Sequence, residues 1–285
     1  MIIYLINAVD LSYLSHAAGP WFNSQGLGTW HSQIRSEKAL NLGSQEIQSL
    51  VHHDHVHRSL YLDEEIFELE MKKIFGKTWV YVGHDSLVPK PGDYVTARVG
   101  RLPVVLSRHS DGKVYVIYNS CGHRGAMVCN DDKGHVDLFR CCYHGWTFKT
   151  NGDLDAVAMP RGYGKSFELN DPALGMRRVP RVAVHRGFVF ASLAADGLSL
   201  EEHLGHAKDS IDELVDRAPA GEIDLSAGVH KYMFRGNWKL QLENVVDMYH
   251  VPFSHESTIQ AQWSAIWPAG RRRFRFGDQR QGSGC

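Results

Sequence analysis

The chain has 285 residues, 43% of them hydrophobic, and a formal charge of −1 at pH 7. A chain of this size and composition can bury a full core and would form one large or two medium domains. The balanced charge gives no indication of a nucleic-acid or membrane-surface partner. No apolar run approaches the ~20 residues needed to cross a bilayer, so we expect a soluble protein.

Residues 1–45 have no sustained hydrophobic period and are predicted to be an irregular extension. Their first nine residues are apolar, but they lack a basic leader and a convincing cleavage site, so a signal peptide is not predicted. Histidines then cluster around Asp54. A metal site is one interpretation of this cluster, and a solvated polar segment is favoured because no closed ligand set with fixed spacing is present. The histidines are His52, His53, His55 and His57.

The first regular element is expected in residues 46–76, as an amphipathic helix that covers residues 63–76. Its apolar positions recur at helical spacing, its first turn is acidic and its last turn is basic, which matches the helix dipole. Gly76 is expected to end it. This helix is predicted to pack against a core and to take no part in chemistry.

Short strands follow, starting at Trp79 and continuing to a strand-like run at 187–190. The dipeptides Asp111-Gly112 and Asn151-Gly152 each separate two β-rich runs, and such dipeptides are typical of two-residue hairpin turns. We therefore expect an all-β domain over residues 77–195.

Two short motifs within this β domain combine cysteine with histidine. Cys121-x-His123 and Cys141-x-x-His144 are separated by seventeen residues. Two thiolates and two imidazoles in mixed pairs suit a [2Fe–2S] cluster in which the cysteines hold one iron and the histidines hold the other, the Rieske arrangement. A tetrahedral zinc site is the alternative, but zinc fingers usually group two cysteines before two histidines. The ligand order therefore favours the cluster.

The remaining cysteines are Cys129, Cys142 and Cys285. Respiratory Rieske proteins carry an extra disulfide beside the cluster, with one cysteine in a Cys-x-Cys-His run, and Cys142 directly follows Cys141 instead. A reducing, cytoplasmic compartment is therefore expected. Cys129 and Cys142 are expected to be small buried residues of the core.

After the β domain, residues 198–215 predict a helix and residues 228–239 predict a strand. Residues 240–250 predict a further helix, in which Glu243 and His250 would share one face with Asp247. The adjoining face is apolar and is expected to dock on the core.

Pro252 is expected to stop this last helix soon after His250, because proline lacks the N–H group and clashes with the preceding turn. The bent chain would then bring His255 back toward His250. Two histidines with a carboxylate suit the facial triad of non-haem iron enzymes, which leaves open positions on Fe(II) for O2 and substrate. A purely structural histidine pair is the alternative.

Both motifs resemble those of one family. The Rieske ligands, with Arg124 and Gly145-Trp146 beside them, resemble the Rieske domain of aromatic ring-hydroxylating oxygenases, and the run from Glu243 to His255 resembles the mononuclear-iron motif of that family. The second run lies about a hundred residues after the first, in the expected order. The resemblance covers roughly residues 50–257 and implies an α+β protein. Its all-β Rieske [2Fe–2S] domain would be followed, over residues 196–285, by the N-terminal part of an α+β, helix-grip-like catalytic domain.

The resemblance implies the α (large) subunit of an oxygenase that hydroxylates or dihydroxylates an aromatic ring compound with O2. Electrons would come from NAD(P)H through a separate reductase and sometimes a ferredoxin, and the assembly would be α3 or α3β3. The implied cofactors are the [2Fe–2S] cluster and a mononuclear Fe(II). The cluster would be held by Cys121, His123, Cys141 and His144, and the Fe(II) by His250 and His255.

The resemblance also gives Asp247 the role of relaying electrons from a Rieske histidine of a neighbouring subunit, His144 being favoured over His123. Glu243 and Asn244 would support the site through hydrogen bonds.

The sequence departs from the family pattern near its C-terminus. The family's third iron ligand is an Asp far downstream of the second His, but the sequence ends thirty residues after His255. Only Glu256 and Asp278 follow as acids, and neither has the expected position. We therefore expect a C-terminally truncated catalytic domain and an impaired oxygenase. A Rieske electron-transfer protein without oxygenase activity is the alternative.

Overall fold

The structure, a computed structural model, describes residues 43–164, 167–259 and 261. The predictions for most of the N-terminal extension, for Asp278 and for Cys285 lie outside these residues. Backbone contacts divide the chain into two units, Met1–Gly236 and Asn237–Cys285. None of the described helices is long and apolar enough to cross a membrane. The predicted domain boundaries stay predictions.

The predicted helix over residues 63–76 is present, but its last turn is wider than that of an α-helix. Asp63 caps the helix through its Oδ1, which accepts hydrogen bonds from the backbone of Glu65 and Ile66. At the other end the Gly76 N–H donates to the Met71 carbonyl at 2.9 Å, the longer step of a π-helix. The helical segments before the sheets are α2 (Ser44–Gln48), α3 (Ser59–Leu62), α4 (Glu64–Glu70) and the π-helical η2 (Met71–Phe75).

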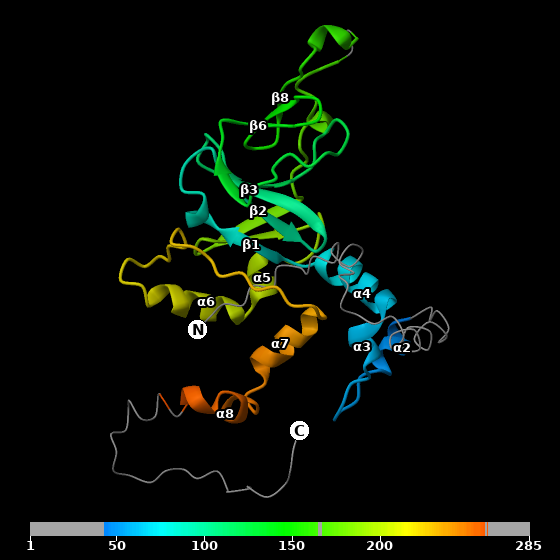
Figure 1. Cartoon of the computed structure of the whole chain (residues 1–285), viewed down its shortest axis with the longest axis vertical. Helices are drawn as coiled ribbons and strands as arrows, with labels where there is room; N and C mark the ends of the chain where they lie inside the picture. The colour runs from blue at the N-terminus through cyan, green and yellow to red at the C-terminus, as the bar shows by residue number, and fades with distance from the viewer. Residues whose placement is uncertain (1–42, 165–166, 260, 262–285) are drawn as a thin grey trace, which may run out of the picture. The chain divides into compact units, whose positions relative to one another are not determined.

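Three antiparallel sheets make up the β part of the first unit (Figure 1). One has the order β1-β10-β9, built from Val80–His84, Phe188–Ser192 and Arg181–His185. The second has the order β4-β3-β2-β5, from Val114–Tyr118, Leu102–Arg108, Asp93–Val99 and Lys133–His135. The third has the order β6-β7-β8, from Leu138–Arg140, Thr147–Lys149 and Leu154–Ala156. Short 3-10 turns lie at Asp85–Leu87, Pro160–Gly162 and Pro172–Leu174.

Both predicted hairpins are present, but each turn is longer than the two residues expected, because the His109 and Lys149 N–H groups donate to the Lys113 and Asp153 carbonyls. Asp111-Gly112 lies between β3 and β4, and Asn151-Gly152 lies between β7 and β8. The two glycines have φ values of +80° and +94°, which residues with a side chain rarely adopt. Local turn chemistry therefore fixes these two strand pairs.

Strand β3 is buried on both faces and separates two parts of the core. Val105 packs with Ile117, Phe139 and Phe148 toward the third sheet. Val104 and Leu106 pack on the opposite face, with residues of the β1-β10-β9 sheet. A continuous apolar run suits a strand covered on both sides. The third sheet lies at one end of this unit, and α5 and α6 lie at the other, beyond β1 (Figure 1).

The helix predicted over residues 198–215 forms two helices, α5 (Leu200–Leu204) and α6 (Ala207–Asp216). Gly205, with φ +47°, interrupts them. Phe188 and Phe190 of β10 pack against Leu200 and Val215 of these helices. Polar contacts connect α6 to the β9–β10 turn. His185 contacts Asp212, and Arg186 forms an ion pair with Asp216.

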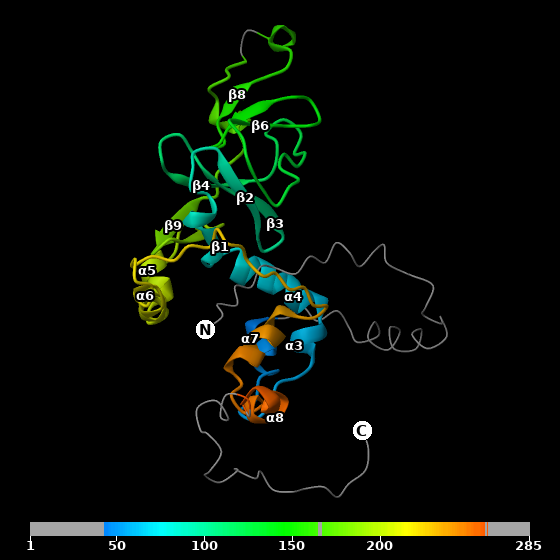
Figure 2. The ribbon, with the colours of Figure 1, turned by 60° about the vertical axis from the view of Figure 1, so that its left-hand side comes forward.

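The strand predicted over residues 228–239 is wrong. Residues 228–236 form no regular element, and α7 (Trp238–Val246) begins within the predicted span, where the Asn237 Oδ1 accepts a hydrogen bond from the Lys239 backbone at 3.1 Å. Tyr232 and Met233 are exposed, so this apolar pattern faces solvent instead of a partner strand. Figure 2 shows α7 followed by α8 (Val251–Ser254) in the second unit.

The β9–β10 turn provides a test of this packing. A Cβ on Gly187, which has φ +87°, would overlap the imidazole of the buried His84, whereas Gly112 has a similar φ and open space around it. Gly112→Ala should lower the free energy of unfolding by about 1 kcal/mol through backbone strain, and Gly187→Ala by about 3 kcal/mol through strain plus overpacking. Urea denaturation measures both, and equal losses would contradict the packing at His84.

Candidate metal centre

Two loops of the first unit have the same backbone closure. The Cys121 N–H donates to the Ala126 carbonyl at 2.8 Å, and the Cys141 N–H donates to the Trp146 carbonyl at 2.9 Å. In each loop the N–H of the fourth residue after the cysteine donates back to that cysteine, and this residue is Gly125 or Gly145. Their φ values are +72° and +69°. Each loop therefore needs glycine at the same place.

The loops bring the four predicted ligands together as two like pairs. The side chains of Cys121 and Cys141 are both buried in the same core cluster, and Cys141 lies near enough to raise the pKa of Cys121. The rings of His123 and His144 have their centroids 4.8 Å apart. In space the two cysteines thus form one pair and the two histidines form the other, although in the sequence each cysteine is next to a histidine.

The surroundings of Cys121 oppose ionisation of its thiol when no metal is bound. Burial raises the pKa of Cys121, and the neighbouring Cys141 raises it further. Two thiolates at this place would need a positive charge between them, because a buried charge is costly unless it is compensated. A metal supplies such a charge and deprotonates its thiol ligands.

The histidine pair has the complementary property. Nδ1 of His123 is buried and accepts no hydrogen bond from the described residues. Burial, together with the neighbouring His144 and Arg124, lowers the pKa of His123 and so favours its neutral ring. A neutral imidazole with an unpartnered nitrogen is the form that binds metals.

The donor set therefore fits a [2Fe–2S] cluster, in which each iron takes only two protein ligands. Among the described residues, no three His, Cys, Asp or Glu side chains gather as the ligands of one metal ion do. The assignment of the four residues to the cluster stays a prediction.

Asn119 supports the first loop, although no sequence pattern points to it. Its Oδ1 accepts hydrogen bonds from the backbone of Val128 at 3.0 Å and of Cys129 at 2.8 Å, and its Nδ2 donates to the Cys129 carbonyl at 2.6 Å. The residue is buried at the end of β4. Its partners lie nine and ten residues away, which no local pattern reveals.

The two extra cysteines differ. Cys129 is buried, as predicted, and burial raises its pKa to about 12. Cys142 is exposed, so the prediction that it packs in the core is wrong. It follows the ligand cysteine in the second loop as the exposed Gly122 does in the first, and this loop position faces solvent. The cysteines of the described residues are all free thiols.

The second predicted site lies at a chain break between α7 and α8, not on one continuous helix. The helix predicted over residues 240–250 ends at Val246. Asp247, with ψ 99°, leaves the helix, and its Oδ1 accepts hydrogen bonds from the backbone of Tyr249 at 2.8 Å and of His250 at 3.3 Å. These backbone hydrogen bonds lower the pKa of Asp247. Short polar side chains compete with the helix in this way.

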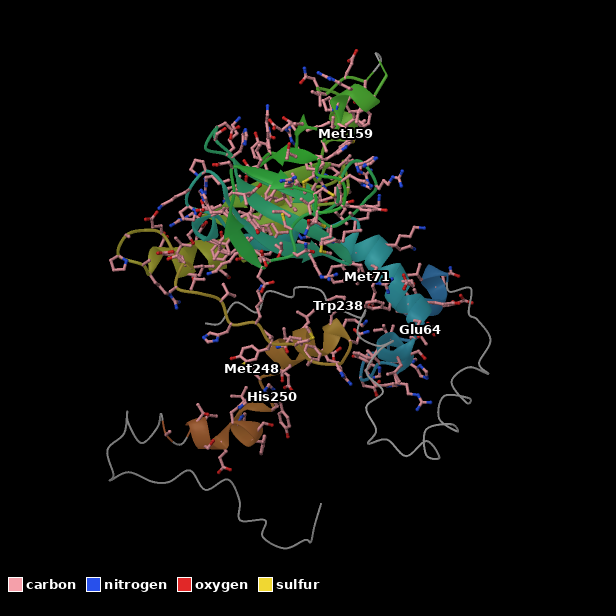
Figure 3. The ribbon with its side chains drawn as sticks, turned by 45° about the horizontal axis from the view of Figure 1, so that its top comes forward. Glu64, Met71, Met159, Trp238, Met248 and His250 are labelled. Carbon is pink, nitrogen blue, oxygen red and sulfur yellow. The ribbon has the colours of Figure 1, made fainter. Side chains whose placement is uncertain are left out.

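The role expected of Pro252 is also wrong. The proline lies in the first turn of α8, where its missing N–H has no helical partner to lose, so it begins a helix instead of ending one. His250 and His255 nevertheless come together, with ring centroids 5.3 Å apart. Figure 3 shows Met248 and His250 at this turn.

Nδ1 of His250 is buried and lies 3.3 Å from Asp247 Oδ2, without hydrogen-bond geometry. Two imidazole rings that lie side by side suit a pair of metal ligands, so His250 and His255 fit an iron ion in part. The described residues add no third ligand group. The roles of His250, His255 and Asp247, and the supporting roles of Glu243 and Asn244, stay predictions.

The apolar face of α7 is exposed within its own unit. Val245 is 49% exposed, Val246 is 69% exposed and Tyr249 is 81% exposed. The docking of this face on the core stays a prediction.

The histidine cluster near the N-terminus is exposed throughout. His52 and His55 stack with ring centroids 4.4 Å apart, and His55 Nδ1 lies 2.7 Å from Asp54 Oδ1. These contacts hold a turn at the surface, and the solvated interpretation stays the prediction.

Comparison with known proteins agrees with the order of the two motifs. Residues 78–167 match the Rieske [2Fe-2S] domain, and residues 204–281 match the catalytic domain of the ring hydroxylating alpha subunit. Toluate 1,2-dioxygenase subunit alpha from Pseudomonas putida is 39% identical over 224 residues, which cover 76% of this chain and 49% of that protein. The chain belongs to the family of Rieske ring-hydroxylating oxygenase α subunits.

Other members of the family support this membership. Anthranilate 1,2-dioxygenase large subunit from Acinetobacter baylyi is 41% identical over 207 residues, covering 71% of this chain and 43% of that protein. The crystal structure of naphthalene 1,2-dioxygenase from Rhodococcus sp., bound to indole, superposes with a TM-score of 0.70 at 32% identity and covers 77% of this chain and 51% of that chain. The chain thus spans about half the length of these relatives. The predicted fold class, a Rieske β domain followed by the start of the catalytic domain, is confirmed.

The support that Asn119 gives to the Rieske loop can be measured. Asn119→Ala leaves three buried backbone groups without partners, so we expect a loss of about 3 kcal/mol in the free energy of unfolding. The same variant should retain less iron, because the first loop loses its anchor. Asn130→Ala, at an exposed position nearby, should change stability by no more than about 0.5 kcal/mol. Urea denaturation and iron analysis test both variants, and equal behaviour would contradict the role of Asn119.

Proposed function

We propose that this chain serves in the α subunit of an oxygenase that uses O2 and reductase-supplied electrons to hydroxylate or dihydroxylate an aromatic ring compound. The observation that supports the proposal most directly is the meeting of two thiols and two imidazoles at the tips of two matched loops. Membership of the family supplies the reaction class.

In this proposal Cys121 and Cys141 hold one iron of a [2Fe–2S] cluster, and His123 and His144 hold the other. Such a cluster passes single electrons at roughly −150 to +300 mV, well above the potential of an all-cysteine plant-type cluster. The protein's part is to fix the ligands on loops closed by backbone hydrogen bonds and to surround the sulfur side with a buried core.

The second unit would bind Fe(II) through His250 and His255. Asp247 keeps its Oδ1 on the backbone of the turn and leaves its Oδ2 beside His250, where a carboxylate can orient the ring and raise its basicity. The same residue would relay electrons from His144 of a neighbouring subunit, with His123 less favoured. This relay requires an assembly of the α3 or α3β3 kind.

The further partners follow from the same proposal. Electrons would come from NAD(P)H through a separate reductase, with or without a ferredoxin, and the free thiols of the described residues suit the cytoplasm. Toluate and anthranilate, in the names of two relatives, are aromatic carboxylates, whereas naphthalene carries no polar group. A substrate panel should therefore contain both kinds of ring.

One observation favours the alternative of a Rieske electron-transfer protein. In the part of the chain that the structure describes, no carboxylate completes a three-ligand site with His250 and His255. Iron held by two imidazoles alone would lack the carboxylate of the facial triad and would be bound weakly.

Iron analysis and turnover together test the proposal. After anaerobic reconstitution and gel filtration, we expect about two iron atoms and two sulfides per chain, because the cluster is retained and the second iron is not. Cys141→Ser should lose both iron atoms. With excess Fe(II), NADH, a reductase and the substrate panel, the chain should form hydroxylated product slowly, and His250→Ala should abolish this product while keeping the cluster.

The other outcomes are distinct. A chain without a cluster would contradict the proposal. A reducible cluster with no product from any substrate would favour the electron-transfer alternative. About three iron atoms per chain with rapid hydroxylation would show that the activity is not impaired.

A further inference from the structure

Trp146 lies flat against one face of the predicted cluster ligand His123. The ring centroids are 4.7 Å apart and the planes differ by 6°. Trp146 is 2% exposed. Nδ1 of His123 has no hydrogen-bond partner among the described residues, and the indole of Trp146 packs along the imidazole ring.

This contact joins the two loops, and it has no equivalent in the opposite direction. The fifth residue after the cysteine closes each loop through its carbonyl, and it is Ala126 in the first loop and Trp146 in the second. The indole of the second loop therefore supports the histidine of the first. Neither loop can shift without changing the packing of His123.

Tyr163 holds Trp146 in place. Its Nε1 donates a hydrogen bond to the Tyr163 hydroxyl at 3.1 Å, and the two rings meet edge to face. The ring of Tyr163 in turn stacks on Phe167 with centroids 4.3 Å apart. The indole is thus fixed in position and in rotation.

The second histidine of the pair has a different surrounding. The ring against His144 belongs to Tyr143, with centroids 3.8 Å apart and a tilt of 39°, and Tyr143 is 60% exposed. One imidazole is therefore backed by a buried, anchored ring and the other by a ring open to solvent. His123 is therefore covered by a buried ring, whereas the ring beside His144 is open to solvent.

We propose that Trp146, anchored by Tyr163, is a positioning residue that fixes His123 and excludes water from it, and thereby lowers the reduction potential of the bound cluster. Reduction adds one electron to a site that already carries two thiolates. Water stabilises the added negative charge better than an indole does, so a site that loses this shield accepts the electron more readily. The inference rests on the proposed cluster assignment.

The test is a redox titration of the reconstituted full chain and its variants, followed by visible absorption and electron paramagnetic resonance. Trp146→Leu removes the stacked ring and should raise the midpoint potential. Tyr163→Phe removes the anchor of the indole N–H and should raise the potential by a smaller amount. Trp146→Phe keeps a flat ring against His123 and should stay closest to the parent chain.

Trp79→Leu is the matched control. Trp79 also donates its indole N–H, to the Leu198 carbonyl at 2.9 Å, and stacks with Arg181, but it packs with the α5–α6 side of the core. The control should lower stability and leave the potential unchanged, because it makes no contact with either loop.

The outcomes separate this inference from the proposed function. A parent chain without a Rieske spectrum would contradict the cluster assignment itself. A Rieske spectrum with the same potential in the parent and in Trp146→Leu would overturn the role of Trp146, as would an equal shift in Trp79→Leu. If Trp146→Leu does not retain the cluster, Tyr163→Phe decides, and an unchanged potential in that variant overturns the inference.

Discussion

The burial of two neighbouring thiols, Cys121 and Cys141, in one core cluster determines what the site can bind. Burial and the neighbouring Cys141 both raise the pKa of the Cys121 thiol, and a buried pair of thiolates needs a compensating positive charge. The fold places these thiols at the tips of loops whose backbones close on themselves, above a sheet whose central strand is buried on both faces. The unpartnered Nδ1 of His123 adds an imidazole donor to these two thiols, and the donor set suits two iron atoms.

The two predicted metal sites differ in how the chain builds them. The Rieske loops are set by long-range contacts, since Asn119 joins β4 to residues 128–129 and Trp146 joins one loop to the other. The histidines of the second unit are brought together by a local turn around Asp247, while the apolar face of α7 stays exposed. The first site is therefore fixed by a packed core, and the second is specified mainly by short-range hydrogen bonds.

Those parts of the fold that depend on local chemistry could be predicted from the sequence. The Asp111-Gly112 hairpin and the helix that ends at Gly76 follow from turn residues and periodicity, and both are present. Helical periodicity failed at Asp247, because a capping side chain ended the helix early. The strand expected over residues 228–239 is absent. An apolar pattern in the sequence can indicate a strand, but it does not show whether a partner strand is present to pair with it. The role of Asn119 could not be found, since its partners are set by tertiary contact alone.

In the proposed site the paired loops hold a cluster whose two irons have different protein ligands. A Mössbauer spectrum of the reduced, iron-reconstituted chain, combined with electron–nuclear double resonance, tests it most directly. We expect two inequivalent iron sites, one ligated by sulfur alone and one coupled to nitrogen from two histidines. A single type of iron, or two irons without nitrogen coupling, would contradict it.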